Sequence, residues 1–158
     1  MRKRKSWQEK LINSKGLPRV ERITAKMSSR RGSGTIVIPA PVEVDSIMKL
    51  VPAGKLVTIN EIRSALAKKH KANIGCPITT GIFAWIAANA AAEAAATGAT
   101  RITPYWRTLK TGGQINEKYP GGADVVRARL EAEGHKIVQR GKKYFVADFE
   151  KSLVALSI

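Results

Sequence analysis

One thiol, Cys76, is the strongest candidate nucleophile in this chain of 158 residues. Pro77 follows it, and proline favours the first position of a helix, which would place Cys76 at the N-cap. A helix N-terminus lowers the pKa of a thiol and so raises its reactive thiolate fraction. Small cysteines also serve simply to pack. A nucleophile and a packing residue therefore both remain open at Cys76, and we favour packing.

A second candidate site is the aromatic run Tyr105-Trp106-Arg107. Tyrosine is mostly protonated at neutral pH and an indole accepts no proton, so this pair is poorly suited to acid–base chemistry. Both rings could stack on an extruded base, where each base contact is worth about 1–3 kcal/mol. The alternative is that they fill the core under the glycine-rich loop that follows. Arg107 would hold this loop or contact a phosphate.

The residue types that bind metals are scarce. His70, His135 and Cys76 make up the whole set of histidines and cysteines, and no zinc spacing is present. We therefore expect no metal and no cofactor. A single cysteine excludes an intramolecular disulfide and is typical of a reducing cytosol.

The charge balance favours a polyanionic partner. The chain has 28 Lys and Arg against 12 Asp and Glu, a formal net charge of +16. Such an excess is typical of nucleic-acid binding. No apolar run is long enough to span a bilayer, and no apolar segment follows the basic N-terminus as in a secretory signal. We expect a cytoplasmic protein, nucleoid-associated in a prokaryote, that binds double-stranded DNA, with RNA as the alternative partner and no membrane.

Positive charge is concentrated in residues 1–33, which we expect to form a flexible basic arm. Arg30 and Arg31 are its candidate phosphate contacts, although a merely solvated tail is the alternative. Within the arm, one short amphipathic turn could dock on the domain through Trp7, Leu11 and Ile12. The folded domain is expected over residues 34–158.

The centre of the chain predicts two helices joined by a turn. Thr58 and Glu61 have the spacing of a capping box, which predicts a helix from there to about residue 69. A turn over residues 73–77 leads to an alanine-rich helix over residues 78–96. A short strand over residues 35–38 and a helix over residues 42–50 precede this pair.

Side-chain size distinguishes the faces of the alanine-rich helix. Ile82, Phe83 and Ile86 are expected in the core. Small residues are expected to face a DNA groove, because they permit close approach to the minor groove. These candidates are Thr79, Thr80, Gly81 and Ala84.

The C-terminal third begins with a long glycine-rich loop over residues 98–124, and such loops often carry function. A helix over residues 125–133 is expected after Asp124 as its cap. A hairpin over residues 136–146 follows, and its basic tip (Arg140, Lys142 and Lys143) could touch phosphates. A hairpin after two helices of this kind is a wing. The fold class expected is mainly α with a small β component, a winged helix-turn-helix in a single domain.

Several segments together resemble the DNA-binding domain of the O6-alkylguanine-DNA alkyltransferase family, over about residues 42–135. Residues 51–58 are similar to the start of its helix-turn-helix, and Ile102-Thr103-Pro104-Tyr105-Trp106-Arg107 is similar to its Pro-Cys-His-Arg loop. Asn89 stands where the family has its hinge asparagine. The glycine pairs of residues 112–113 and 121–122 and the segment 130–134 resemble its later loop and closing helix.

The departures from the family concern its chemistry. Tyr105 replaces the nucleophilic cysteine, Trp106 the activating histidine, and Thr80 the arginine inserted into the base stack. Ile59 replaces an early tyrosine. Glu133 is retained from the catalytic network, but without the histidine we expect it to be structural or to have no role. The alkyltransferase-like branch of the family also lacks the cysteine. This resemblance implies a protein that binds alkylated DNA without repairing it and passes it to other DNA repair proteins.

We therefore expect a non-enzymatic DNA-binding protein of the alkyltransferase-like type. Its base pocket would comprise Tyr105, Trp106, Arg107 and Glu133. One alternative is an active methylated-DNA–protein-cysteine methyltransferase that uses Cys76. The other is a general basic protein that binds DNA or RNA.

Overall fold

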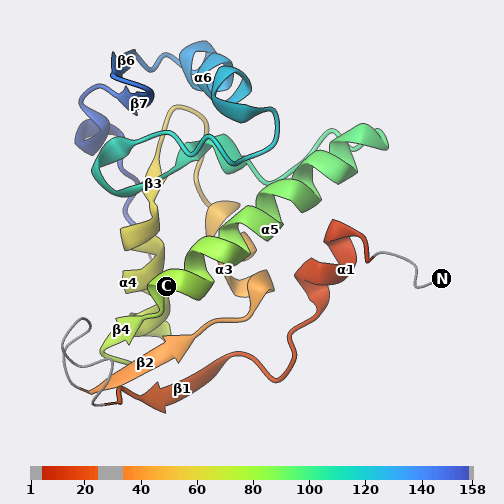
Figure 1. Cartoon of the computed structure of the whole chain (residues 1–158), viewed down its shortest axis with the longest axis vertical. Helices are drawn as coiled ribbons and strands as arrows, with labels where there is room; N and C mark the ends of the chain where they lie inside the picture. The colour runs from red at the N-terminus through yellow and green to blue at the C-terminus, as the bar shows by residue number, and fades with distance from the viewer. Residues whose placement is uncertain (1–4, 25–33, 157–158) are drawn as a thin grey trace.

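Helix α5 (Pro77–Ala96) is the longest element and crosses the molecule diagonally, in contact with most other helices (Figure 1). The structure is a computed structural model and describes residues 5–24 and 34–156. The other helices in this part are α1 (Trp7–Ile12), α3 (Pro41–Met48), α4 (Ile59–Lys69) and α6 (Gly122–Ala132), with 3-10 turns η1 (Tyr105–Arg107), η2 (Thr111–Gly113) and η3 (Phe149–Ser152). The strands are β1 (Arg19–Arg22), β2 (Thr35–Ile38), β3 (Val57–Thr58), β4 (Ile74–Gly75), β5 (Thr108–Leu109), β6 (Ile137–Arg140) and β7 (Lys143–Val146).

A small mixed sheet forms one end of the molecule. Strand β2 pairs antiparallel with β1 and parallel with β4, in the order β1-β2-β4. The β-branched run of β2 was predicted, and Val37 at its centre is fully buried. Strand β1 was not predicted, because Arg19–Arg22 has mostly exposed side chains and no apolar alternation.

Much of the expected arm belongs to the folded domain. Over residues 5–24 it contains α1 and β1, and α1 packs on α5. The predicted docking of a short amphipathic turn is confirmed for Trp7 and Leu11: Leu11 is buried, and the ring of Trp7 meets the ring of Trp85 edge-on with centroids 4.8 Å apart. It is wrong for Ile12, which is 72% exposed. Arg30 and Arg31 lie outside the described residues.

Helices α3, α4 and α5 enclose the core. Its largest fully buried side chains include Met48 of α3 and Ile62 and Leu66 of α4. Alanines of α5 at residues 84, 87, 88, 90 and 91 are also buried in this core. Because alanine is small, its helix can lie close against its neighbours.

The predicted pair of helices, α4 and α5, is confirmed. Thr58 is the N-cap of α4, where its hydroxyl accepts from the amide of Asn60 at 3.2 Å and donates to the carboxylate of Glu61. Pro77 takes the first position of α5. Between them, Gly75 lies so close to α4 that a Cβ there would be 2.6 Å from the carbonyl oxygen of Arg63. No side chain fits this crossing.

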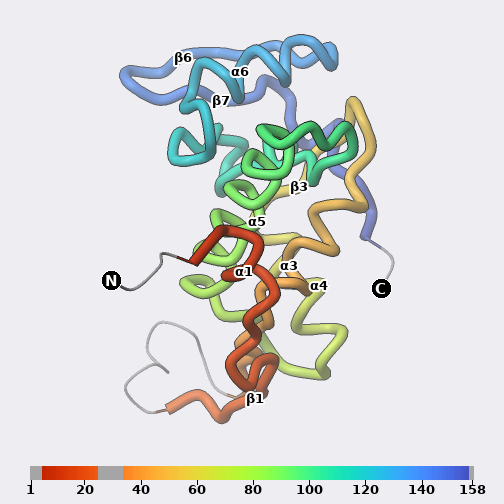
Figure 2. The backbone as a smooth tube through the Cα atoms, turned by 90° about the vertical axis from the view of Figure 1, so that its right-hand side faces the viewer, coloured from red at the N-terminus to blue at the C-terminus, as the bar shows by residue number. Residues whose placement is uncertain are grey.

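The opposite end of the molecule carries α6 and the antiparallel hairpin β6–β7 (Figure 2). The hairpin confirms the sequence prediction. The cap of α6 does not: Gly121, in a left-handed conformation, is the N-cap, and Asp124 lies in the first turn. Strands β3 and β5 pair in parallel, which joins the start of α4 to the segment after η1. Among residues 5–24 and 34–156, no helix combines the length and apolar composition that a membrane crossing requires.

Candidate nucleic-acid interface

The N-terminal half of α5 presents an apolar edge to solvent. Ile78 is 60% exposed, Ile82 46% and Trp85 38%, and Gly81 lies among them. We call these four residues the α5 edge. They form one wall of a hollow of about 450 Å³, the α5 hollow, whose other wall contains Lys110, Asn116 and Lys118. The indole Nε1 of Trp85 donates to the carbonyl of Lys118 at 3.2 Å, which fixes this ring at the edge of the hollow.

The assignment of faces on α5 was wrong for three residues. Thr80 and Ala84 were expected to face DNA, but both are fully buried. The hydroxyl of Thr80 donates to the carbonyl of Cys76 at 2.6 Å. Ile82, expected in the core, is exposed instead. The physical reason is that α5 is apolar or small on every face, so no polar stripe marks its outside.

The other expected DNA contacts on α5 have mixed positions. Gly81 lines the α5 hollow. Thr79 is half-buried, and its hydroxyl has no hydrogen-bond partner within the described residues. The side chain of Asn89 is half-buried and donates to the carbonyl of Trp85 at 2.9 Å, one turn earlier in α5.

Tyr105 and Trp106 are core residues, with only 4% and 7% of their surfaces exposed. The ring of Tyr105 meets those of Trp106 and Tyr119 edge-on, at 5.3 and 6.0 Å between centroids. Burial raises the pKa of the Tyr105 phenol above its usual value, although Arg129 opposes this. The open alternative of core packing is therefore the one that the structure supports, and Tyr105 offers no face to an extruded base.

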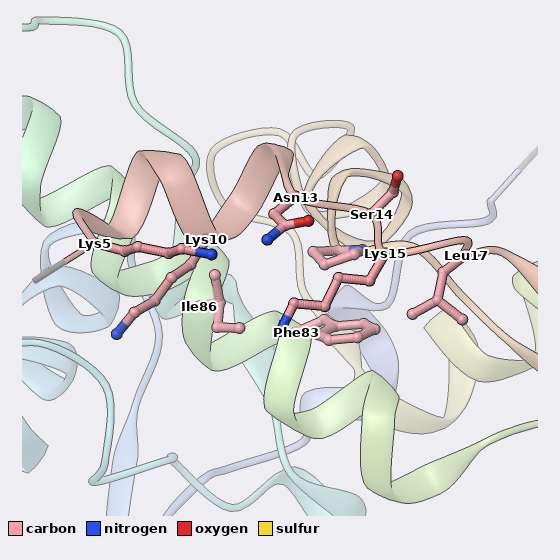
Figure 3. A pocket seen from close by; sticks show the side chains of 9 residues that line it. Lys5, Lys10, Asn13, Ser14, Lys15, Leu17, Phe83 and Ile86 are labelled. Atoms are coloured by element: carbon pink, nitrogen blue, oxygen red, sulfur yellow. The ribbon is translucent and has the colours of Figure 1, made fainter. Parts of the chain in front are cut away.

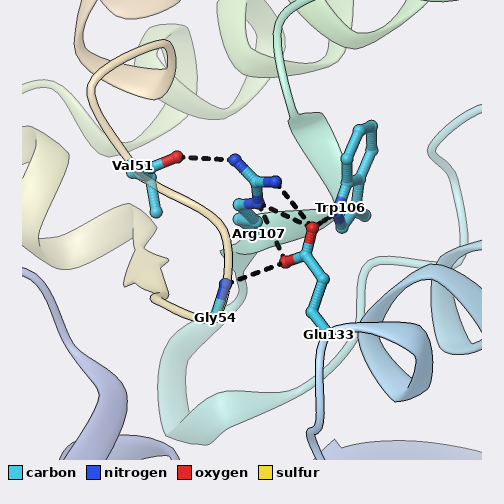
Figure 4. Close-up of polar contacts among 5 residues, drawn as sticks. All are labelled: Val51, Gly54, Trp106, Arg107 and Glu133. Atoms are coloured by element: carbon cyan, nitrogen blue, oxygen red, sulfur yellow. Dashed lines mark hydrogen bonds and ion pairs between the residues drawn. The ribbon is translucent and has the colours of Figure 1, made fainter.

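The carboxylate of Glu133 ties this segment to the start of the helix pair (Figure 4). It accepts from Trp106 Nε1 at 3.1 Å and from the amide of Gly54 at 3.3 Å. Arg107 approaches it most closely, with Nη2 2.6 Å from Oε2, and also donates to the carbonyl of Val51 at 2.8 Å. Arg107 therefore holds the loop, which was one of its two expected roles.

The electrostatics of Glu133 follow from these donors. Burial raises the pKa of its carboxyl, but the hydrogen bonds from Arg107, Trp106 and Gly54 outweigh burial and hold the pKa below its usual value. Glu133 is thus an ionised, well-satisfied group rather than a proton donor. Of the two expectations for Glu133, a place in the base pocket and a structural role, its hydrogen bonds to Gly54, Trp106 and Arg107 support the structural role.

A second basic hollow lies behind Trp106, near the C-terminal end of α5. It has a volume of about 480 Å³ and is lined by Trp106 together with Lys49, Arg101, Arg107 and Arg129. The guanidinium of Arg129 lies over the indole of Trp106, 4.3 Å from its centroid. This hollow is where the residual exposed surface of Trp106 meets solvent.

Cys76 is the N-cap of α5, as predicted, and is partly exposed. His70 ends α4 and contacts Glu43, with Nε2 2.7 Å from Oε2. Cys76 is separated from Ala95, which lines the hollow behind Trp106, by 19 residues of helix, or about 28 Å. Cys76 is therefore far from the hollow beside Trp106, next to the segment that resembles the family's active-site loop.

The predicted basic tip of the hairpin is solvent-exposed at Arg140, Lys142 and Lys143. The guanidinium of Arg140 packs on the ring of Phe145 at 5.3 Å, which restrains one of the three cations. The hairpin is joined to the loop after η2 by a bridge between Gln114 and Phe145. The tip therefore presents three positive charges on a hairpin that is held against the rest of the domain.

Comparison with known proteins finds two solved structures that are similar to this chain. No family model matches the chain, and no curated protein matches it. The crystal structure of S. pombe ATL in complex with DNA is similar with a TM-score of 0.53 and 20% identity, over 73% of this chain and 94% of that one. S. pombe Atl1 in complex with damaged DNA containing O6-carboxymethylguanine gives a TM-score of 0.48 and 19% identity over the same shares. The chain therefore has the fold of S. pombe ATL, mainly helical with a small β component.

Proposed function

We propose that this chain is a non-enzymatic DNA-binding protein of the alkyltransferase-like type. Its proposed location is the cytoplasm, in association with the nucleoid in a prokaryote. Helices α4 and α5 would act as the helix-turn-helix, and the β6–β7 hairpin as its wing. The observation that carries the proposal is the exposed apolar α5 edge next to Lys110 and Lys118. The similarity of fold to S. pombe ATL, which was solved in complex with DNA, supports it.

The α5 edge has the chemistry of a wedge. Proteins that bind the minor groove often insert apolar side chains between base steps, which unstacks them and bends the duplex. Ile78 and Ile82 are branched side chains held on a long helix, and both are about half exposed or more. Lys110 and Lys118 then lie beside this wedge, where they can neutralise phosphates. The tip of the hairpin adds further phosphate contacts.

The α5 hollow is the best place for a displaced base. Its volume of about 450 Å³ is that of a small-molecule site, and it has both apolar and polar walls. Trp85 offers an aromatic surface for stacking, while Asn116 supplies hydrogen-bonding groups. This proposal replaces the pocket at Tyr105 and Trp106, because both rings are buried. Alkylated guanine is the lesion that the sequence resemblance implies.

A titration with two labelled duplexes tests the proposal, one of them with a central O6-methylguanine, each at two salt concentrations. DNA binding predicts tight, salt-dependent association, and lesion recognition predicts tighter binding to the modified duplex. An RNA duplex serves as competitor, and equal competition by RNA would favour the general basic protein.

A matched pair of variants tests the α5 edge. Ile82→Asp places a charge on the edge and should weaken binding about tenfold or more, as expected for a central contact. Val125→Asp is the control, because Val125 is 40% exposed on α6 and does not line the α5 hollow. Equal binding by the two variants would refute the α5 edge as the interface.

A further inference from the structure

A third hollow, of about 300 Å³, lies between α1 and α5 (Figure 3). We call it the α1 hollow. Three lysines surround it, Lys5, Lys10 and Lys15, and Phe83 and Ile86 of α5 form its apolar wall. Asn13 and Ser14 add polar groups, and none of the described residues that line it has a carboxylate. The chemistry of this surface is that of an anion site.

Helix α1, which contains Lys10 and lies between Lys5 and Lys15 in the chain, is anchored. The carboxylate of Glu93 on α5 accepts from the amides of Trp7 and Gln8, at 3.0 and 3.2 Å. The Gln8 side chain also donates to the carbonyl of Ala90 at 3.1 Å, and Trp7 packs on Trp85. Because α1 is already fixed on α5, the backbone around these lysines loses little conformational entropy when they bind a ligand.

The α1 hollow and the α5 hollow lie on two sides of the same stretch of α5. Ile82 and Trp85 line the α5 hollow, whereas Phe83 and Ile86, on the same turns, line the α1 hollow. A helix with its side chains is about 10–12 Å wide. The grooves of DNA are about 6 and 12 Å wide, and the minor groove opens when it is wedged. A helix seated in a groove therefore has one phosphate strand on each side.

We propose that the α1 hollow binds backbone phosphates of the DNA strand opposite the one contacted by Lys110 and Lys118. The α5 edge then lies in the groove with a basic rim on both sides. This inference rests on the proposed function, and it extends the DNA interface to the segment before the alkyltransferase-like region. Lys10 and Lys15 each neutralise a phosphate in this arrangement.

The test compares two double variants with the same change in net charge. Lys10→Gln/Lys15→Gln removes the charges of the α1 hollow. Lys68→Gln/Lys71→Gln is the control: Lys10 and Lys68 are both in the last turn of a helix, Lys15 and Lys71 both have positive φ (47° and 55°), and the control pair lines neither hollow. Duplex affinity is measured over a range of salt concentrations, and the melting temperature of each variant is recorded.

For the α1 variant, the slope of log affinity against log salt concentration should be smaller in magnitude by about two. Each lost phosphate contact reduces this slope by about one. The control should keep nearly the slope of the unmodified protein. Equal slopes in both variants, with tight binding by the unmodified protein, would overturn the α1 hollow as a DNA contact and leave the proposed function intact. Failure of the unmodified protein to bind duplex DNA would overturn both.

A second measurement uses only the unmodified protein, so it does not depend on the folding of a variant. Uncharged methylphosphonate linkages are moved stepwise along each strand of the duplex, and the affinity of the unmodified protein is measured. Neutral linkages should weaken binding at positions on both strands. If neutral linkages weaken binding on one strand only, the α1 hollow does not contact the second strand.

Discussion

Arg107 and Glu133 form an ion pair between η1 and the end of α6, with Nη2 2.6 Å from Oε2 and both side chains about 15% exposed. In the family that the sequence resembles, the segment with Arg107 belongs to the active-site loop. Here Tyr105 and Trp106 fill the interior on one side of the pair, and Glu133 binds Trp106 directly. In this chain the segment is part of the structural core, and the contribution of the ion pair to stability can be tested.

Replacing Glu133 by Gln should lower the free energy of unfolding by about 2–3 kcal/mol, because a largely buried guanidinium loses its charged partner. Urea denaturation of both proteins gives the value. Glu131→Gln is the control: Glu131 pairs with Arg127 at 2.9 Å on the exposed face of α6, and its side chain is 49% exposed. Loss of such a surface pair should cost about 0.5 kcal/mol or less. Similar costs for the two variants would contradict a structural role for the Arg107–Glu133 pair.

The same pair predicts a pH dependence. The pKa of Glu133 is held below its usual value because its hydrogen bonds outweigh burial. A carboxyl with a lowered pKa in the folded state contributes stability above its unfolded pKa of about 4.3, and this is lost as pH falls through the folded pKa. The difference in unfolding free energy between the protein and its Glu133→Gln variant should be full at about pH 6 and shrink below about pH 4. A constant difference over this range would show that Glu133 ionisation does not stabilise the fold.

Thr103 is predicted to anchor the loop to α3. Its hydroxyl donates to the carboxylate of Asp45 at 2.6 Å, and both residues are buried. Thr103→Val should therefore cost about 1.5–3 kcal/mol, since it removes a hydrogen bond to a charged group and leaves a buried acceptor unsatisfied. Thr97→Val, at an exposed threonine at the end of α5, should change stability by about 0.5 kcal/mol or less. Thermal melts compare the stability of the two variants. If Thr103→Val leaves the stability unchanged, Thr103 does not anchor the loop.

Cys76 should not accept an alkyl group. It caps α5 about 28 Å along the helix from Ala95, which lines the hollow behind Trp106. Intact-mass measurement after incubation with O6-methylguanine DNA should show no added methyl group under conditions where the DNA is bound. A stoichiometric increase that disappears in Cys76→Ser would instead establish the methyltransferase alternative.

Local signals made most of the fold predictable. The Thr58 and Glu61 spacing, Pro77 and the β-branched run of β2 each indicate an element through backbone and capping chemistry, and each element is present. Strand β1 was missed because its only support is pairing with β2, a contact that its own side chains do not encode.

The site was less predictable, since burial depends on which faces meet. The composition of α5 hides its orientation, so Ile82 and Thr80 exchanged places between expectation and structure. The partners of Glu133 come from residues 54, 106 and 107, which only the tertiary fold brings together. The α5 hollow could have been anticipated in part from Lys110 and Lys118 in the glycine-rich loop, whose position suggested function.

Gly75 has a consequence for how this protein can change over evolution. Its backbone lies against Arg63 where no Cβ fits, so the direction in which α5 leaves α4 depends on a missing methyl group. A side chain at this position would tilt α5 and carry Ile82 and Trp85 with it. Since α5 is a stiff rod, a small displacement at its root grows along its length. The orientation of the proposed interface thus depends on a residue that does not line it, and Gly75 should tolerate substitution as poorly as the residues of the α5 edge.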